Sequence, residues 1–193
     1  MKEICFVTGN QNKLREVKKI LKNYKILSLE DLKFFEDIPE TESTIKGNAF
    51  LKSSFIYNKF KINCFSDDTG LFIKELDGEP GVKSARYASN ISDSEKNIDL
   101  VLKNLKSAIN RSAYFETTIC LIIDGDIKYF NGKAIGKITT KRIGRKGFGY
   151  DPIFIPYGYD KTLAQFTLKQ KNKISHRSIA VRKLVDYLNK YIS

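Results

Sequence analysis

Two adjacent carboxylates mark one place where this sequence could do chemistry. Asp67 and Asp68 stand in the segment SDDTG (residues 66–70), between two apolar runs typical of strands. A carboxylate pair at a strand end can hold a hard cation and accept a proton from water. Because neighbouring side chains on a strand point to opposite faces, the two should have different roles. The alternative is a tight turn, in which Asp and Gly are simply favourable residues.

A second candidate is the segment TGNQNK (residues 8–13), where an apolar run ends and a helical pattern begins. Free N–H groups and the positive dipole end make a helix N-terminus an anion site. Gly9 permits a close backbone approach, and Lys13 adds a point charge for phosphate. Glu16 shares a helix face with Lys13. A capped strand–helix turn with a solvated lysine explains the same residues, and this is not a Walker pattern.

Acidic and aromatic residues stand in two further segments. Glu40 and Glu42 precede a predicted helix, where they could bind a metal or simply favour the helix dipole. In the basic loop RKGFGYDP (residues 145–152), Phe148 lies between two glycines. Exposed rings stack on nucleobases, worth roughly 1–3 kcal/mol each. A plain hairpin loop is the alternative, but it gives no local reason for an apolar residue at this position.

Lys171 and the segment Ser175-His176-Arg177 supply donors near the C-terminal end. His176 is the only histidine, which excludes a cluster of histidine metal ligands. No G-x-S-x-G elbow occurs, which argues against acyl transfer. His and Arg donors can read the O6 and N7 acceptors of a purine, as they do in DNA grooves. The alternative is that Ser175 caps a helix and its two neighbours are solvated.

The elements that must position these residues follow from hydrophobic periodicity. Asp124-Gly125-Asp126 is a hairpin signal between two long strand-like runs. Short connections and mixed elements predict an α/β fold in a single domain, residues 1–193. Strands are expected at 3–8, 25–29, 62–66, 71–75, 113–123 and 127–138, and helices at 11–23, 44–60, 94–109 and 176–191.

Composition narrows the classes of protein. The chain has 193 residues and a formal net charge of +12. Its lysines are scattered, which predicts a solvated basic surface rather than specific nucleic-acid binding. No apolar run approaches the ~20 residues of a membrane span or forms a signal peptide, so a cytoplasmic protein is expected. The three cysteines (Cys5, Cys64 and Cys120) lie in apolar runs, which predicts buried reduced thiols.

The ordered motifs TGNQNK, DDTGL, GEPGVKSARYA, GFGYDPIF and SHRSIA, from Thr8 to about Ala180, resemble the inosine triphosphate pyrophosphatase family. This resemblance implies an elongated, two-lobed α/β fold with a long central mixed sheet and an active cleft between the lobes. It also implies a homodimer that uses Mg2+ to hydrolyse ITP, dITP and XTP to the monophosphate and pyrophosphate. Such an enzyme would remove non-standard purines from the nucleotide pool.

The resemblance also implies roles for individual residues. Asp68 is expected to be the general base and a metal ligand, with Asp67 and Glu40 as the other metal ligands. Thr69 should touch the substrate. The remaining substrate contacts are Thr8, Gly9, Asn10, Gln11, Asn12 and Lys13 for the triphosphate, Phe148, Gly149, Tyr150 and Asp151 for base and sugar, and Lys171, His176 and Arg177 over phosphate and base.

Some positions depart from the family pattern. Thr69 stands where Ser is usual, and Ser89 replaces a glycine after ARYA. Glu42 stands where Gly is common, and Gly47 where an acidic residue often precedes Asn48. The changes at 42 and 47 bear on which acidic group is a metal ligand. None of the departures lies in the segments expected to read the base.

Two rival functions stay open at this point. A basic nucleic-acid-binding module fits the net charge and the aromatic loop, and would bind polynucleotides in a salt-dependent way. A pyrophosphatase of the same fold could instead act on pyrimidine or modified dTTP-like nucleotides. The GFGYDP and SHR segments favour purines.

Overall fold

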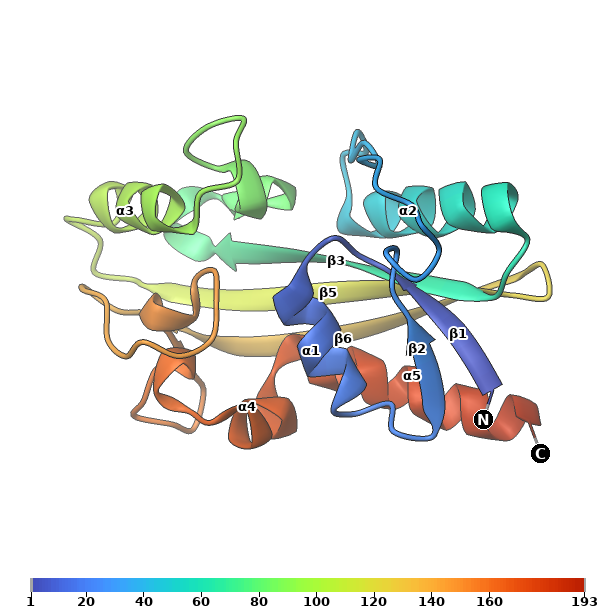
Figure 1. The fold of residues 1–193 in the computed structure, drawn as a ribbon. Coiled ribbons are helices and arrows are strands. Elements are labelled where there is room, and N and C mark those ends of the chain that lie inside the picture. Colours follow the sequence, from blue (N-terminus) through green and yellow to red (C-terminus); the bar gives the residue numbers. More distant parts are fainter. Residues whose placement is uncertain (1, 193) are drawn as a thin grey trace. The chain divides into compact units, whose positions relative to one another are not determined.

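The structure is a computed structural model in which residues 2–192 are described. It contains the predicted mixture of strands and helices (Figure 1). The strands are β1 (Lys2–Val7), β2 (Tyr24–Leu27), β3 (Cys64–Ile73), β4 (Pro80–Gly81), β5 (Ser112–Ile123), β6 (Asp126–Ile138) and β7 (Phe154–Pro156). The α-helices are α1 (Gln11–Lys18), α2 (Ile45–Phe60), α3 (Ser94–Asn104), α4 (Leu168–Ile174) and α5 (His176–Ile192). Short 3-10 helices lie at Lys74–Leu76, Val82–Arg86, Asp151–Ile153 and Leu163–Gln165.

The strands form one mixed sheet, in the order β2-β1-β3-β5-β6-β7, with β4 paired to β3. β1 runs parallel to both β2 and β3, whereas the β3–β4 and β6–β7 pairs are antiparallel. The predicted α/β class with a mixed sheet is therefore confirmed. No helix among residues 2–192 is long and apolar enough to span a membrane.

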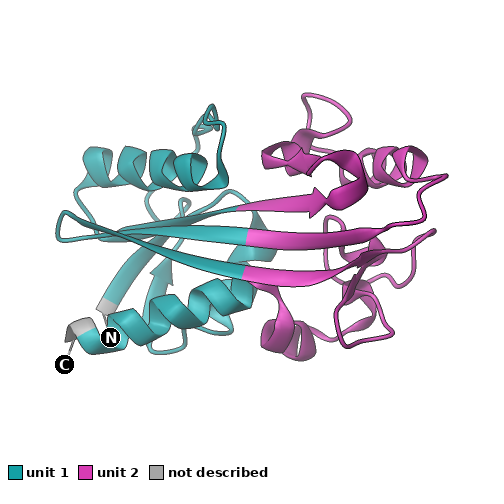
Figure 2. Cartoon of the chain, turned by 180° about the vertical axis from the view of Figure 1, so that it is seen from behind, with its two compact units in different colours: residues 1–68, 117–132, 177–193 teal, residues 69–116, 133–176 magenta. Residues whose placement is uncertain are grey.

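The chain separates into two compact units (Figure 2). Unit 1 comprises residues 1–68, 117–132 and 177–193, and unit 2 comprises residues 69–116 and 133–176. The boundaries fall inside β3, β5 and β6, so each of these strands contributes residues to both units.

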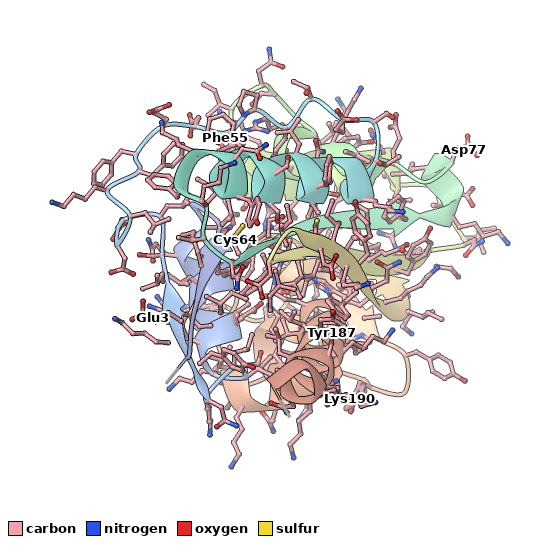
Figure 3. All side chains as sticks on the ribbon, turned by 90° about the vertical axis from the view of Figure 1, so that its right-hand side faces the viewer. Glu3, Phe55, Cys64, Asp77, Tyr187 and Lys190 are labelled. Carbon is pink, nitrogen blue, oxygen red and sulfur yellow. The ribbon has the colours of Figure 1, made fainter. Side chains whose placement is uncertain are left out.

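Unit 1 has a core on each face of its strands, because alternate residues of a strand point to opposite faces. Ile4 and Phe6 of β1 pack in a cluster with Leu14 and Val17 of α1 and Leu184 of α5. The opposite cluster contains Cys5, Val7 and Cys64 together with Ile56 of α2, and Figure 3 shows Cys64 beneath that helix. Helices α1 and α5 therefore cover one face and α2 the other, as Figure 1 also shows.

Unit 2 is held together by its own apolar cluster. Ile98 and Val101 of α3 pack with Leu71 and Ile73 of β3 and with Phe154 of β7. Short segments not predicted from the sequence, including α4 and β7, complete this unit. They are too short for hydrophobic periodicity to reveal, because a helix pattern needs a window of about 11–18 residues and strand alternation about 4–8 residues.

The DDTG segment differs from the prediction. The strands predicted at 62–66 and 71–75 leave these residues as a turn between them, but residues 64–73 form the single strand β3. The residues on either side pair with neighbouring strands, β1 at 64–66 and β4 at 71–72. These ladder hydrogen bonds on both sides outweigh the turn preference of Asp and Gly. Gly70 also suits a strand here, because a Cβ atom on it would lie 2.8 Å from the carbonyl oxygen of Gly81.

The hairpin and helix predictions are confirmed with shifted ends. Asp124 and Gly125 connect β5 to β6 and both have positive φ, 50° and 89°, as a two-residue type I′ turn requires. Helix α1 ends at Lys18 rather than at residue 23, and α3 ends at Asn104 rather than at residue 109. The predicted starts of α2 and α5 agree with the structure to within one residue.

Candidate active site

The phosphate-loop candidate lies where β1 ends and α1 begins. The Asn10 side chain caps α1 and accepts hydrogen bonds from the backbone N–H groups of Asn12 and Lys13, at 2.9 and 3.2 Å. Asn10 in turn donates its own N–H to Thr8 Oγ1. Gly9 is exposed, and a Cβ atom built on it would meet nothing within 4 Å. The loop thus leads into an exposed helix N-terminus, and the Asn10 cap fixes the backbone conformation there.

Lys13 points from this helix to the first carboxylate of β3. Its Nζ lies 3.0 Å from Asp67 Oδ1, and the lysine side chain is 15% exposed. Burial lowers the pKa of Lys13, and the charge of Asp67 opposes that shift. Gln11 behaves differently, because its amide donates to Glu30 on the exposed surface. Of these loop side chains, Lys13 is the one that reaches the buried carboxylates.

Asp67 is the centre of a buried ion-pair network in unit 1. Arg177, at the start of α5, donates from Nε to Asp67 Oδ2 and from Nη1 to Glu16 Oε2, both at 2.8 Å. All three side chains are almost fully buried. Burial alone would raise the pKa of Asp67, but Lys13 and Arg177 outweigh it and hold that pKa below its ordinary value. Asp67 is therefore ionised, with both oxygens facing cations.

Asp68 faces the opposite side of β3, toward α2. Asn48 Nδ2 donates to Asp68 Oδ2 over 3.3 Å, and Lys52 Nζ lies 3.7 Å from Asp68 Oδ1. Lys52 also forms an ion pair with Glu40. Burial raises the pKa of Asp68, although the charge of Lys52 opposes this shift. The two aspartates therefore point to opposite faces of β3, as expected for neighbouring strand residues, and their different roles stay a prediction.

Lys52 is a residue that the sequence argument missed. It lies on the buried stripe of α2, together with Ile45, Ala49 and Ile56. A lysine is rarely buried unless it is paired, so its place within an apolar helical stripe was an available signal. Its pKa is raised because Asp68 and Glu40 outweigh the opposing effect of burial, which keeps the ammonium charged.

The fit of these residues to a divalent cation follows from their donor atoms. Among residues 2–192 no three Asp, Glu, His or Cys side chains converge to form a metal site from protein alone. Mg2+ is usually bound by one or two carboxylates, completed by water and substrate phosphates. Asp68 and Glu40 fit that pattern, because both face the same positive charge of Lys52. Asp67 fits less well, because Lys13 and Arg177 occupy its two oxygens.

In unit 2, three predicted residues lie together. Asp151 Oδ2 accepts the backbone N–H of Phe148 at 2.9 Å and also pairs with the buried ammonium of Lys171. That ammonium stands 4.6 Å from the centre of the Phe148 ring. Gly147 must be glycine here, because it has a φ of 77° and its Cβ would lie 2.0 Å from Asp151 Oδ2. The basic loop is thereby held in one shape, with Phe148 only partly buried.

A cavity of about 710 Å³ adjoins this loop. Arg142, one of its lining residues, forms ion pairs with Glu95 and Asp99. Two other cationic residues that line the cavity, Arg145 and Lys146, are exposed. The full lining is Ser94, Glu95, Arg142, Gly144, Arg145, Lys146, Gly147, Phe148, Gly149 and Pro152.

Three further predicted residues are Tyr150, His176 and Thr69, of which the first two are buried against other parts of the protein. The Tyr150 hydroxyl donates to the carbonyl of Ser84, and its burial raises the pKa of the phenol. The His176 ring is buried and stacks on Phe115, with centroids 4.5 Å apart. Thr69 is partly buried on β3, next to Asp68. The roles predicted for these three residues in substrate binding stay predictions.

Comparison with known proteins places these observations in a family context. A family model described as the Ham1 family matches residues 4–187. A protein of Flavobacterium johnsoniae named dITP/XTP pyrophosphatase is 47% identical over 187 residues, which cover 96% of this chain and 97% of that protein. A protein of the same name from Thermoanaerobacter pseudethanolicus is 41% identical over 192 residues, with 97% of each chain covered.

Solved structures agree with the sequence comparison. The Ham1 protein of Staphylococcus aureus matches with a TM-score of 0.89 and 38% identity, over 98% of this chain and 100% of that one. A protein of Mycobacterium abscessus, described as a nucleoside-triphosphatase / dITP/XTP pyrophosphatase, has a TM-score of 0.75 and 34% identity. That match covers 94% of this chain and 98% of the other.

Proposed function

This chain belongs to the Ham1 family, and from that premise we propose that it is a pyrophosphatase of non-standard purine nucleoside triphosphates. ITP, dITP and XTP would be hydrolysed to the monophosphate and pyrophosphate. The names of the relatives support this reaction class. The observation that supports it most directly is the pair Asp67 and Asp68, whose side chains meet cations on opposite faces of β3.

The residues of unit 1 would perform the phosphate chemistry. A triphosphate brings about four negative charges, and Lys13 and Lys52 are positive groups next to the two aspartates. In the proposed step, Asp68 accepts a proton from the water that attacks the α-phosphorus. The bond from the α-phosphorus to its bridging oxygen then breaks, and pyrophosphate leaves. Asp67 would keep Lys13 and Arg177 in fixed positions through this step.

We also propose that the reaction requires Mg2+. Glu40 and Asp68 would hold the ion, and Asp67 is the third ligand predicted from the sequence. When bound, the ion would neutralise phosphate charge and lower the pKa of a bound water. The ammonium of Lys52 already lies beside both carboxylates, which supports the proposal that this position attracts positive charge.

The residues of unit 2 would bind the base and sugar. Phe148 would stack on the purine, and Asp151 and Lys171 fix the loop that presents it. His176 of this unit and Arg177 of unit 1 would donate hydrogen bonds to O6 of hypoxanthine or xanthine. Adenine would be rejected, because leaving a donor unpaired in a closed pocket costs about 1–3 kcal/mol. We also propose a cytoplasmic homodimer, and light scattering of the purified protein would test its dimeric state.

A nucleotide panel with product identification tests the proposed function. The purified protein with Mg2+ would be given ITP, dITP, XTP, GTP, ATP and dTTP, and the products separated by ion-exchange chromatography. We expect IMP and pyrophosphate from ITP, with much slower turnover of ATP and dTTP. First products of IDP and orthophosphate would refute the pyrophosphatase reaction. Preferential turnover of dTTP would instead favour the pyrimidine alternative.

A further inference from the structure

Asn48 is a buried amide whose two ends are both engaged. It is 3% exposed and is the fourth residue of α2. Its Oδ1 accepts the backbone N–H of Glu42 at 2.9 Å, and its Nδ2 donates to Asp68 Oδ2 at 3.3 Å. A backbone N–H can only donate, so it must face the amide oxygen. The Glu42 N–H therefore turns the NH2 group of Asn48 toward Asp68.

Gly47 provides the space that this arrangement needs. Glycine in a helix is usually less stable than alanine, so its presence in the first turn of α2 needs a reason. A Cβ atom on Gly47 would lie only 2.7 Å from Cβ of Glu42 and 3.1 Å from its Oε2. The Glu42 side chain thus fills the volume that a side chain at position 47 would take. The two departures from the family pattern, Glu42 in place of Gly and Gly47 in place of an acidic residue, are therefore sterically coupled.

We propose that Asn48 is a positioning residue for Asp68, set by the backbone N–H of Glu42, and that Gly47 lacks a side chain so that Glu42 can approach. The segment before α2 would then fix the direction of the Asp68 carboxylate. This inference rests on the proposed function of Asp68 in hydrolysis. It concerns contacts among residues of unit 1 alone.

A matched control exists within the same chain. Asn97 is also 3% exposed and is the fourth residue of its helix, α3. Its Oδ1 accepts the backbone N–H of Ala88 at 2.8 Å, and its Nδ2 donates to the carbonyl of Ala85 at 2.9 Å. It makes the same kind of bonds as Asn48, but to backbone groups rather than to Asp68.

The first test compares Asn48→Ala with Asn97→Ala. Both should lower the melting temperature, because each leaves buried polar groups unpaired. Only Asn48→Ala should lower kcat for ITP, by roughly 10- to 100-fold, the usual effect of losing a group that orients an active residue. Its KM should change much less. Equal losses of kcat in the two variants would overturn the proposal.

The second test uses rescue at positions 42 and 47. Gly47→Ala should lower kcat even though alanine is the better helix former. Adding Glu42→Gly should restore most of the activity, since it removes the conflicting Cβ. Adding Glu42→Ala should not, because that residue keeps its Cβ. Wild-type kcat in Gly47→Ala, or equal rescue by both second changes, would refute the steric part of the proposal.

A readout independent of activity separates this inference from the proposed function. Crystal structures of wild type and Asn48→Ala would be compared at Asp68. We expect the carboxylate to turn away from its wild-type orientation in the variant. An unmoved Asp68 would overturn the positioning role. If the wild type hydrolyses no triphosphate, the proposed function fails, and the crystal comparison still decides the role of Asn48.

Discussion

Arg177 donates from Nε to Oδ2 of Asp67 over 2.8 Å, although 110 positions separate the two residues in the sequence. The same guanidinium donates to Glu16, so it is held between two buried carboxylates. Asp67 and Glu16 keep Arg177 charged, since they raise its pKa against the opposing effect of burial. The direction in which this guanidinium can donate is consequently set by the fold of unit 1.

Arg177→Ala should reduce both stability and selectivity. Removing one partner from a buried ion pair leaves uncompensated charge, which costs about 3–5 kcal/mol of unfolding free energy. If Arg177 also reads O6, the ratio of kcat/KM for ITP over ATP should fall roughly 10- to 100-fold. Urea unfolding and a two-substrate assay measure these effects, with the exposed Lys190→Ala as control. An equal loss for ITP and ATP would make Arg177 a structural or phosphate-binding residue only.

Phe148→Ala should weaken all purine substrates by a similar factor, because stacking does not depend on ring substituents. The loss should be about 1–3 kcal/mol in kcat/KM, the usual value of one base–aromatic stack. Measurements with ITP, XTP, GTP and ATP would check it, with Tyr157→Ala as the control at a side chain that is 86% exposed. A loss confined to one base would contradict the stacking role.

Asp68→Asn should lower kcat by at least ~10²-fold, since an amide cannot accept the proton of the attacking water. The variant should stay folded, because asparagine keeps the shape of the side chain beside Asn48 and Lys52. Single-turnover assays and circular dichroism together separate lost chemistry from lost structure. The exposed Asp126→Asn serves as the control. Near-normal turnover in folded Asp68→Asn would move the role to Asp67 or Glu40.

Removal of divalent cations should abolish activity, and Mg2+ should restore it. Glu40→Gln should raise the Mg2+ concentration needed for half-maximal rate by roughly tenfold or more, the usual effect on metal affinity of weakening a ligand shell. The reason is that Glu40 faces the same cation position as Asp68. A titration of rate against Mg2+ measures this, with the exposed Asp37→Asn as control. Full activity after exhaustive treatment with EDTA would contradict the metal requirement.

The buried thiols should make the protein less stable at alkaline pH. Burial raises the pKa of Cys120 from 9.0 to about 11. A raised folded-state pKa gives stability that is complete below the unfolded value and is lost as pH rises through the folded value. Between pH 9 and 11 this thiol should account for a loss of about 2–3 kcal/mol. Urea unfolding of wild type and Cys120→Ala across this range tests it, and identical slopes would refute it.

Much of the local structure follows from the sequence alone. Residues within a few positions of one another set the strand–helix junction at residues 8–13 and the Asp124-Gly125 turn. The same holds for the start of α2, where Thr44 Oγ1 accepts the backbone N–H of Gly47. The strand period also predicted that Asp67 and Asp68 face opposite sides, and the structure confirms it. Such features depend on backbone sterics and short-range hydrogen bonds, which a single sequence records directly.

The partners of the charged groups were decided by tertiary structure. Lys13 and Glu16 share a helix face, but no local pattern indicates that Arg177 would join them across 161 positions. Lys52 likewise meets Asp68 only because α2 packs over β3. The DDTG segment is extended because the residues of β3 on either side of it pair with other strands. Periodicity fixes which face a residue occupies, whereas packing between distant elements fixes what that face meets.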